Sequence, residues 1–210
     1  MARNLDAKCK QCRRTGEKLF LKGERCGSPK CAIVKRNYPP GVHGSKGRKR
    51  MTDYGLRLME KQKAKKIYNL LEKQFKLTFE KAKKQKGNAS ENFVKLLEMR
   101  LDNAICRAGF ASSHSQAREL VGHGHFLVNG KKVTIPSYQI KIGDIIKVKE
   151  KSKMSKQFSN LENTLKKIKL PGWLNLDIKD LSAKVLSAPA AEDGKSINFN
   201  PQMIVEFYSR

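Results

Sequence analysis

The stretch from Arg100 to Val148 constrains the fold of this chain more than any other part of it. Two helix-forming segments are separated there by Gly109 and a group of serines. Because glycine often ends a helix in the left-handed conformation and serine often begins the next one, this pattern predicts a helix, a tight turn and a second helix. Asn129-Gly130 fits the two-residue turn of a β-hairpin, and Gly143-Asp144 predicts a turn into a further strand. The stretch therefore predicts a small α+β module.

The chain carries positive charge along nearly its whole length. Its 210 residues include 45 lysines and arginines against 19 acidic residues, which gives a formal net charge of +26 and a pI near 10.1. Such a surface repels itself unless a polyanion covers it, so the charge indicates a nucleic acid as partner. The length allows one good core or two modest ones, and a large catalytic domain with its own substrate domain is therefore not expected.

The sequence contains no apolar run long enough to cross a bilayer. The opening residues, MARNLDAKCKQC, lack the apolar segment of a secretory signal. We therefore expect a cytoplasmic protein that does not enter a membrane.

Four of the five cysteines stand close together. Cys9, Cys12, Cys26 and Cys31 have the spacing C-x2-C-x13-C-x4-C, whereas Cys106 stands alone and is expected to pack as a small hydrophobe. Two close pairs joined by a short loop can bring four thiolates to one metal ion, which then stabilises a segment with few apolar side chains. Two disulfides are disfavoured in a reducing cytoplasm. We expect a bound Zn2+ ion; an iron–sulfur cluster is the alternative, because four cysteines can hold one as well.

A basic loop follows the cysteines. It begins with YPPGVHG at Tyr38–Gly44, and cations crowd the residues from Lys46 to Arg50. Proline and glycine deny the loop a regular structure, while its cations can follow a phosphate backbone. The rings of Tyr38 and His43 can stack on a base or ribose. The alternative for this stretch is a linker without a binding role.

The segment from Thr52 to Lys86 has the periodicity of helices. Thr52 or Asp53 is expected to cap the first helix, and Asn69 to separate it from the second. A basic face formed by Lys63, Lys65 and Lys66 is the candidate for contact with RNA. The apolar positions expected to be buried are Leu56, Met59, Ile67, Leu71 and Phe75.

The second helix of the module is expected to bind phosphate. Exposed backbone amides at a helix start attract anions, and Gln116 and Arg118 lie beside this one. His123 and His125 form an H-x-H pair without an identifiable third metal ligand. We therefore expect contact with RNA or simple loop packing for this pair.

Several motifs in one order make the chain resemble the family of bacterial small-subunit ribosomal protein four. Arg100–Val148 resembles the S-four RNA-binding domain of that family. The further motifs are the cysteines, YPPGVHG, DYGLRLMEKQKAKKIY at Asp53–Tyr68, HGHFLVNGKKVTIPSY at His123–Tyr138, PGWL at Pro171–Leu174 and the closing IVEFYSR. Many relatives lack the full cysteine set, so the cysteines indicate a metal-binding branch. The segment Ser182–Asn198 matches only loosely.

The resemblance implies an α+β fold. An S-four RNA-binding domain, which is a helix-turn-helix plus a small twisted β-sheet, is inserted into a helical domain, and a four-cysteine metal knot precedes both. We expect a metal-binding arm and basic loop at residues 1–45. The helical domain is expected at 46–95, completed by 199–210, and the S-four RNA-binding domain with its following strands at 96–198.

The resemblance also implies a structural constituent of the small ribosomal subunit. Such a protein binds the 5′ domain of small-subunit ribosomal RNA, nucleates assembly and, with ribosomal protein five, influences translational accuracy. Ribosomal proteins five and three and messenger RNA near the channel by which it enters are the other expected partners. The residues expected to contact RNA are Arg13, Arg14, Arg36, Tyr38, His43, Lys46, Arg48, Lys49, Arg50, Arg57, Lys63, Lys66, Ser113, Gln116, Arg118, His123, Asn129, Lys131, Lys132 and Tyr138.

Two other functions remain as alternatives. Arg100-Leu101-Asp102 imitates a short motif around the catalytic aspartate of pseudouridine synthases, which carry the same module. Such an enzyme needs a separate catalytic domain of strands, which the surrounding sequence does not predict. A stand-alone RNA binder built on the module would not require the YPPGVHG loop or the closing IVEFYSR. We therefore expect a protein that is not an enzyme.

Overall fold

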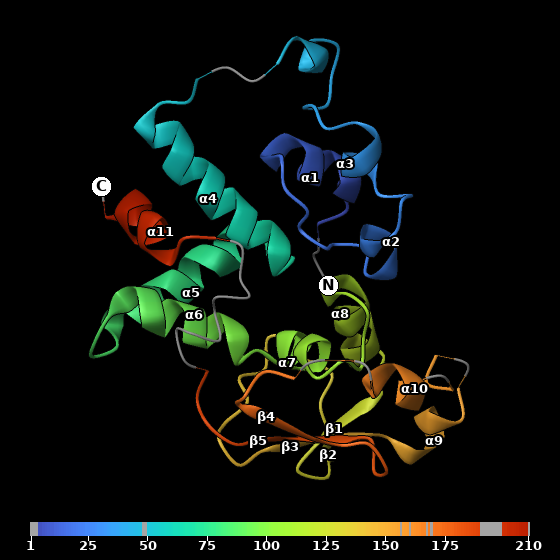
Figure 1. The fold of residues 1–210 in the computed structure, drawn as a ribbon. Coiled ribbons are helices and arrows are strands. Elements are labelled where there is room, and N and C mark those ends of the chain that lie inside the picture. The colour runs from blue at the N-terminus through green and yellow to red at the C-terminus, as the bar shows by residue number, and fades with distance from the viewer. Residues whose placement is uncertain are drawn as a thin grey trace. The chain divides into compact units, whose positions relative to one another are not determined.

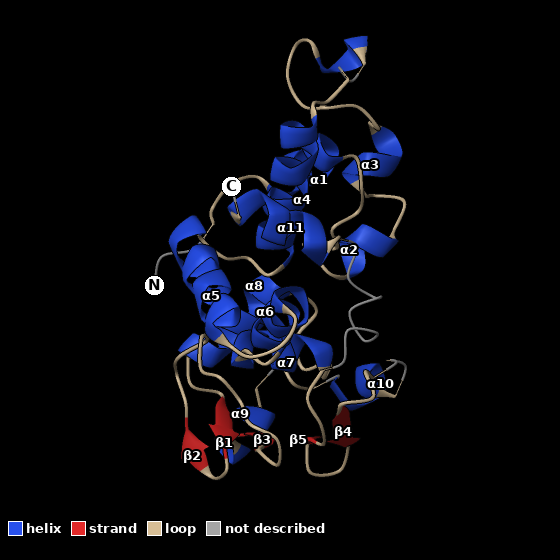
Figure 2. Cartoon of the chain, turned by 90° about the vertical axis from the view of Figure 1, so that its left-hand side faces the viewer, coloured by secondary structure: helices blue, strands red, loops and turns tan. Residues whose placement is uncertain are grey.

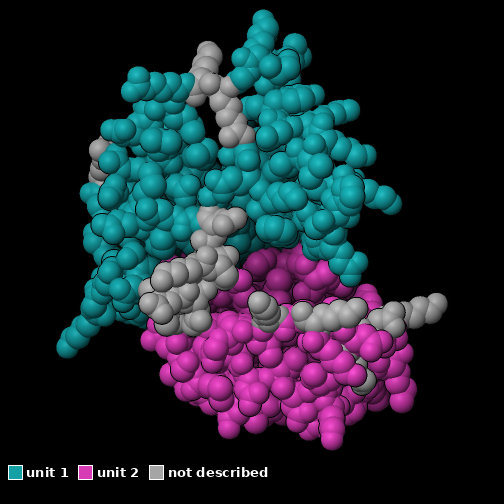
Figure 3. Space-filling view, viewed as in Figure 1, with its two compact units in different colours: residues 1–93, 197–210 teal, residues 94–196 magenta. Residues whose placement is uncertain are grey.

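The computed structural model describes residues 4–47, 50–155, 157–159, 161–166, 168, 170–189 and 199–209 (Figure 1). The chain forms two compact units (Figure 3). Unit 1 comprises Met1–Phe93 and Ile197–Arg210, and unit 2 comprises Val94–Ser196. The described helices include none whose length and apolar content would suffice to span a bilayer.

The first part of unit 1 consists of short helices around a small apolar cluster. These are α1 (Lys8–Thr15), α2 (Glu24–Gly27), α3 (Ala32–Lys35) and the 3-10 helix η1 (Gly44–Lys46). Leu19 and Leu21 are buried with Cys12, and Ile33 packs against them together with Ile67 of α4 (Asp53–Ile67). The cluster therefore attaches the cysteine-containing segment to α4.

The remaining helices complete unit 1. They are α4, α5 (Glu72–Lys84), α11 (Pro201–Tyr208) and the first part of α6 (Ala89–Glu98). The hydroxyl of Thr52 accepts a hydrogen bond from the amide of Gly55 at 3.2 Å, so the predicted cap of α4 is confirmed. Asn69 has a φ of +52° between α4 and α5, which confirms the predicted break. The carboxy-terminal helix α11 lies along α4 (Figure 1).

Aromatic rings fill the interior of unit 1. The ring of Phe93 meets those of Phe75 and Phe79 edge to face, at centroid distances of 5.1 and 5.7 Å. Tyr208 of α11 stacks on Phe79 at 4.7 Å. Each such pair stabilises the folded state by about 0.5–1.5 kcal/mol beyond what the burial of the two rings contributes. Helix α11 is therefore an integral part of the core of unit 1.

The predicted exposure of α4 is wrong in part. Leu56, expected in the core, is 37% exposed, as is Leu71 just before α5, whereas Lys63, expected on an exposed basic face, is only 6% exposed. The ammonium of Lys63 lies 2.6 Å from Glu17 and 3.6 Å from Glu60. A lysine stem is readily buried when carboxylates hold its ammonium group. Glu17, which lies in the segment between α1 and α2, supplies one of the two carboxylates that hold Lys63.

Unit 2 combines helices with one antiparallel sheet. Its first helices after α6 are α7 (Leu101–Arg107) and α8 (His114–Gly122). The strands, red in Figure 2, are β1 (Phe126–Val128), β2 (Lys131–Lys132), β3 (Ile145–Val148), β4 (Leu174–Asp177) and β5 (Ser182–Val185), in the order β2-β1-β3-β5-β4. Between β3 and β4 the chain forms α9 (Glu150–Lys153) and α10 (Leu161–Leu165). The predicted α+β class is confirmed.

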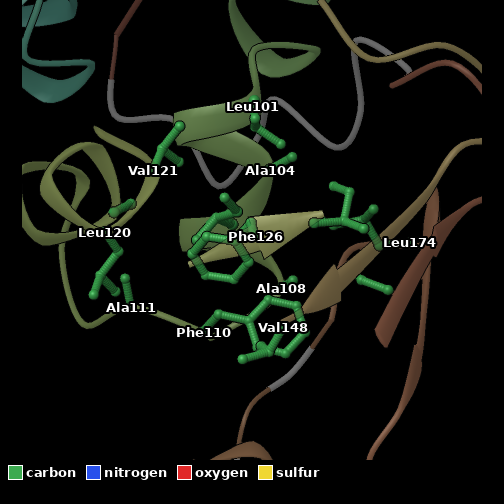
Figure 4. Close-up of a cluster of buried hydrophobic side chains, with 14 of the residues drawn as sticks. Leu101, Ala104, Ala108, Phe110, Ala111, Leu120, Val121, Phe126, Val148 and Leu174 are labelled. Atoms are coloured by element: carbon green, nitrogen blue, oxygen red, sulfur yellow. The ribbon is translucent and has the colours of Figure 1, made fainter. Parts of the chain in front are cut away.

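The core of unit 2 lies between the helices and one face of the sheet. Phe126 is fully buried among side chains of α7 and α8, including Ala104 and Val121 (Figure 4). Burial alternates along β1 and β5, as expected for a sheet with one covered face. The predicted hairpin turn is confirmed, because Asn129 and Gly130 both have positive φ, +49° and +79°.

Candidate nucleic-acid interface

Arg13 of α1 holds the loop that begins at Tyr38. Its Nε donates to the carbonyl oxygen of Tyr38 at 3.0 Å, and its Nη2 donates to that of Pro39 at 3.2 Å. The guanidinium carbon lies 4.7 Å from the centroid of the Tyr38 ring. A Cβ at Gly44 would overlap with the carbonyl oxygen of Pro39, so the loop closes tightly on itself. Arg13, which was predicted to contact RNA, therefore positions Tyr38. Tyr38 is the residue whose ring was predicted to stack on a base or ribose.

The other cations predicted to contact RNA in unit 1 differ in exposure. Lys66 is half-buried in α4. Arg57 donates to a carboxylate oxygen of Glu206 at 2.8 Å, so its charge is partly used within the protein. Arg48 and Lys49 lie outside the described residues. The exposed members of the set are Arg14, Arg36, His43, Lys46 and Arg50.

The four clustered cysteines line one cavity. Its volume is about 20 Å³, and Cys9, Cys12, Cys26 and Cys31 all contribute to its wall. Burial raises the pKa of the Cys12 thiol, and the other three cysteines raise it further against a backbone hydrogen bond at Leu19. As they are placed, no group of three or more His, Cys, Asp or Glu in the described part of the chain could hold a metal ion. The structure thus gathers the cysteines but does not show the expected metal knot.

The turn between α7 and α8 is fixed by side chains that were predicted to contact RNA. The hydroxyl of Ser113 accepts from the amide of Gln116 at 3.4 Å and caps α8. Oε1 of Gln116 accepts from the amide of Ser112 at 2.9 Å and from its hydroxyl at 2.7 Å. Gly109 ends α7 with a φ of +85°. Ser113 and Gln116 therefore shape the turn, while Arg118 lies half-buried one turn into α8.

Behind this turn lies a polar network that the sequence did not reveal. Nε2 of His114 lies 2.8 Å from Oδ1 of Asn103, whose Nδ2 donates to Glu98 at 2.7 Å. Glu98 also accepts from Arg107 at 2.9 Å. Burial, and then the charge of Arg107, lowers the pKa of His114 to about 4, so the ring is neutral near pH 7. The partners of His114, Asn103 and Glu98, come from the preceding helices α7 and α6. The residues next to His114 in the sequence therefore gave no indication of this network.

Cys106 and the Arg100–Asp102 pair, which also lie in this region, serve the structure and not a reaction. Burial raises the pKa of the Cys106 thiol to about 11, and its sulfur lies 3.8 Å from Nδ1 of His114. This pair is a neutral thiol beside a neutral ring, unlike an activated nucleophile. Arg100 and Asp102, which imitate a catalytic motif, hold each other in two hydrogen bonds of 3.0 and 2.8 Å and are each 3% exposed. Asp102 thus serves the start of α7.

The hairpin presents cations on a fixed frame. Oδ1 of Asn129 accepts from the amide of Ile145 at 2.9 Å, and its Nδ2 donates to Asp144 at 2.8 Å. Its side chain, predicted to contact RNA, therefore joins the hairpin to β3. Lys131 and Lys132 are exposed. A Cβ at Gly124 would overlap with Cε of Lys132, which places that lysine stem against the end of α8.

The two histidines after α8 have different environments. His123 is exposed, whereas Nδ1 of His125 lies 2.9 Å from the hydroxyl of Ser152. Burial, followed by the charges of His123 and Lys149, lowers the pKa of His125. His125 therefore packs within unit 2, and His123 remains available at the surface. Tyr138, also predicted to contact RNA, is 36% exposed.

The outer face of the sheet carries lysines that were not predicted to bind. The register pairs Leu127 with Lys147 and Ile145 with Lys184. These positions alternate with the buried positions of the same strands. The signal was the two-residue period of the strands, which puts every second residue on the face away from the core.

Comparison with known proteins covers the whole chain. The family model described as "Ribosomal protein S4/S9 N-terminal domain" matches residues 3–98, and the model of the S4 domain matches residues 99–146. "Small ribosomal subunit protein uS4" of Clostridioides difficile is 52% identical over 210 residues, which cover 100% of both chains. "Small ribosomal subunit protein uS4A" of Clostridium perfringens is 51% identical with the same coverage.

A third relative agrees with these two. "Small ribosomal subunit protein uS4" of Acetivibrio thermocellus is 52% identical over 211 residues and is likewise covered in full. Identity of this level over the full length of the sequences compared, together with the inserted hairpin module and the returning carboxy-terminal helix, leads to one assignment. The chain belongs to the family of small ribosomal subunit protein uS4.

Proposed function

We propose that this chain is a structural protein of the small ribosomal subunit and binds the ribosomal RNA of that subunit. Membership of the uS4 family over its full length carries this proposal. Such a protein acts in the ribosome, in the cytoplasm, and is not an enzyme. The net charge of +26 supplies the positive charge that closely packed RNA requires.

The mode of action is positioning. Exposed cations such as Lys131 and Lys132 neutralise phosphates and release counterions. Tyr38 and Tyr138 offer rings on which unpaired bases can stack. Because Asn129 fixes the hairpin by hydrogen bonds within the protein, unit 2 presents its cations on a rigid frame. A rigid surface of this kind recognises the shape of a folded RNA with few base contacts.

The resemblance supports finer proposals about the partners. The RNA site is the 5′ domain of the small-subunit RNA, where early binding nucleates assembly. Ribosomal proteins five and three are the protein neighbours, and contact with protein five influences translational accuracy. Messenger RNA passes nearby, at the channel by which it enters. The ordered set of motifs that the chain shares with this family supports these proposals.

The cysteine cavity supports a metal-binding role. Cys9, Cys12, Cys26 and Cys31 would hold a Zn2+ ion, which would stabilise the fold of the first segment when bound. Four thiolates repel one another, and a divalent cation removes that repulsion. An iron–sulfur cluster is the second candidate.

Elemental analysis of the chain, purified without chelator, tests this proposal. Zinc should be found in wild type and in the control Cys106→Ser, but little in Cys12→Ser. Iron together with visible absorption would favour the cluster, and the absence of both metals would contradict the proposal.

Sedimentation tests the ribosomal role. An epitope-tagged copy of the chain in cells should sediment with small subunits in a sucrose gradient. It should stay with them in a salt wash that removes nonspecific RNA binders, since those bind through phosphates alone. A tagged chain that remains at the top of the gradient, or that spreads equally over all RNA, would contradict the proposal.

A further inference from the structure

A cavity of about 840 Å³ lies between α1 and α4 in unit 1. Its wall also includes Pro40 of the basic loop and Met51, just before α4. The volume falls within the range of small-molecule sites in proteins, roughly 300–1,000 Å³. None of the described residues of its wall also lines the cysteine cavity, so these two cavities are separate.

Cations dominate the charged part of this wall. Lys10 and Arg14 come from α1 and Lys66 from α4, against one acidic residue, Asp6, among the described lining residues. Burial lowers the pKa of Lys66, and the nearby charge of Arg14 lowers it further. Two like charges that approach each other beside a cavity are stabilised by an anion between them.

The rest of the wall suits a flat, partly polar group. Met51, Leu58 and Met59 provide an apolar surface, and methionine adapts well to the face of an aromatic ring. Gln11 is only 6% exposed, and its Nε2 donates to Asn4 at 3.2 Å. Its buried Oε1 has no hydrogen-bond partner in the described part of the chain. A buried acceptor left in this state is costly, and a ligand with an N–H group would satisfy it.

An anion, an aromatic plane and an N–H donor occur together in a nucleotide. We infer that this cavity receives one unstacked nucleotide of the bound RNA. Its phosphate lies against Arg14 and Lys66, its base packs on the methionines, and an amino or ring N–H group of the base donates to Oε1 of Gln11. Unpaired bases that leave a stack are the usual targets of specific RNA recognition. The inference rests on the proposed function, because it takes RNA as the source of the nucleotide.

Methionine methyl groups give a direct readout. The full chain, labelled with 13C at its methionine methyls, is titrated with small-subunit 5′-domain RNA, with nucleoside monophosphates and with inorganic phosphate. A base packed on the apolar wall should move the Met51 and Met59 signals by its ring current. Met154, which lies in unit 2 and is 94% exposed, is the internal control.

The three titrations separate the sources of the ligand. Shifts of Met51 and Met59 with the RNA support the inference, whether or not free nucleotides produce them too. Shifts with free nucleotides but not with the RNA would overturn the assignment to RNA. Shifts that inorganic phosphate reproduces in full would overturn the place assigned to the base.

Substitutions provide a second test that does not depend on the spectra. Gln11→Met and Arg14→Gln should each weaken binding to the 5′-domain RNA about tenfold, as expected for loss of one hydrogen bond to the base or one charge-assisted contact with its phosphate. Lys76→Gln removes one exposed charge of α5 and should have a much smaller effect at the same salt concentration. Thermal unfolding confirms that each variant is folded. Equal losses in all three variants would overturn the inference.

The two proposals fail in distinguishable ways. If wild-type chain prefers the 5′-domain RNA but Met51 and Met59 do not move, only the nucleotide site is wrong. If wild-type chain shows no preference among RNAs, the proposed function is wrong.

Discussion

The hydroxyl of Tyr208 donates a 2.9 Å hydrogen bond to Oε1 of Glu72, and so joins α11 to α5. The same carboxylate accepts from Lys61 at 2.7 Å and from Lys65 at 2.9 Å. The ammonium of Lys61 lies 4.6 Å from the ring centroid of Phe207, beside Tyr208 in α11. One carboxylate therefore connects α4, α5 and α11 and closes unit 1.

Tyr208→Phe should destabilise unit 1 by about 0.5–1.5 kcal/mol, because Glu72 loses one hydrogen bond while the aromatic packing remains. Hydrogen–deuterium exchange of the α11 amides measures this change, and exchange should become faster. Tyr54→Phe is the control, since Tyr54 is 56% exposed and no hydrogen bond of its hydroxyl is seen among the described residues. Equal exchange rates in both variants would contradict the role of Tyr208.

Glu72 should make the stability of unit 1 depend on acidity. Burial alone would raise the pKa of Glu72, but hydrogen bonds from Lys61, Lys65 and Tyr208 lower it from about 4.5 to about 2. The folded state therefore binds this proton less readily than the unfolded state. The stabilisation is complete above pH 4.5 and is lost as the pH falls toward 2.

Glu72→Gln removes this titration. The difference in unfolding free energy between wild type and Glu72→Gln should shrink as the pH falls through this range. Glu80→Gln, at an exposed position of α5, is the control and should show a nearly constant difference. A constant difference for Glu72→Gln as well would show that the carboxylate is not held in this way.

Arg13→Lys keeps the charge of α1 but loses the paired hydrogen bonds to the Tyr38 loop. The loop should become more sensitive to protease, and affinity for 5′-domain RNA should fall about fivefold, as loss of one or two such bonds allows. The salt dependence of binding should not change, because the number of charges is the same. Arg25→Lys, at an exposed position of α2 outside the set of predicted RNA contacts, should change neither the protease sensitivity nor the affinity; equal behaviour of the two variants would contradict the positioning role of Arg13.

His114 should give unit 2 its own pH dependence. Its pKa lies at about 4 in the folded chain, below the ordinary value of 6.5. The unfolded state therefore gains a proton first, and the stability of unit 2 should be constant above pH 6.5 and decline as the pH falls from 6.5 toward 4. Fluorescence of Trp173, the only tryptophan and 1% exposed in unit 2, follows its unfolding.

His114→Gln retains a donor toward Asn103 but cannot titrate, so it should flatten this decline. His43→Gln, at an exposed position in unit 1, should leave the profile as it is in wild type. An unchanged decline in His114→Gln would assign the pH dependence to another group.

Features that depend on neighbouring residues were predictable from the sequence. Asn129 and Gly130 tolerate the positive φ values of the hairpin turn, and Thr52 caps α4 through the amide of Gly55. Asn200 likewise caps α11 before Pro201, by accepting from the amide of Gln202 at 2.9 Å. In each case two or three consecutive residues determine the local conformation.

Features that depend on distant partners were not predictable. Lys63 looked like a solvent-facing cation, but Glu17 of another segment holds it in the protein. The side chains of Gln116 and Asn129 looked like RNA contacts, yet each is engaged in hydrogen bonds that shape a turn. The type of a polar residue does not tell whether its side chain makes hydrogen bonds within the protein or binds a ligand. The nucleotide cavity is formed by α1 and α4 together, so neither segment alone indicates it.

The central claim is that this basic chain recognises the small-subunit ribosomal RNA. The most direct measurement is its binding to a transcript of the 5′ domain and to an unrelated RNA of equal length, across a series of salt concentrations. We predict that a preference for the 5′ domain persists at physiological salt, where affinity that rests on phosphates alone collapses. Equal affinity for both RNAs, lost in parallel as salt increases, would contradict the claim.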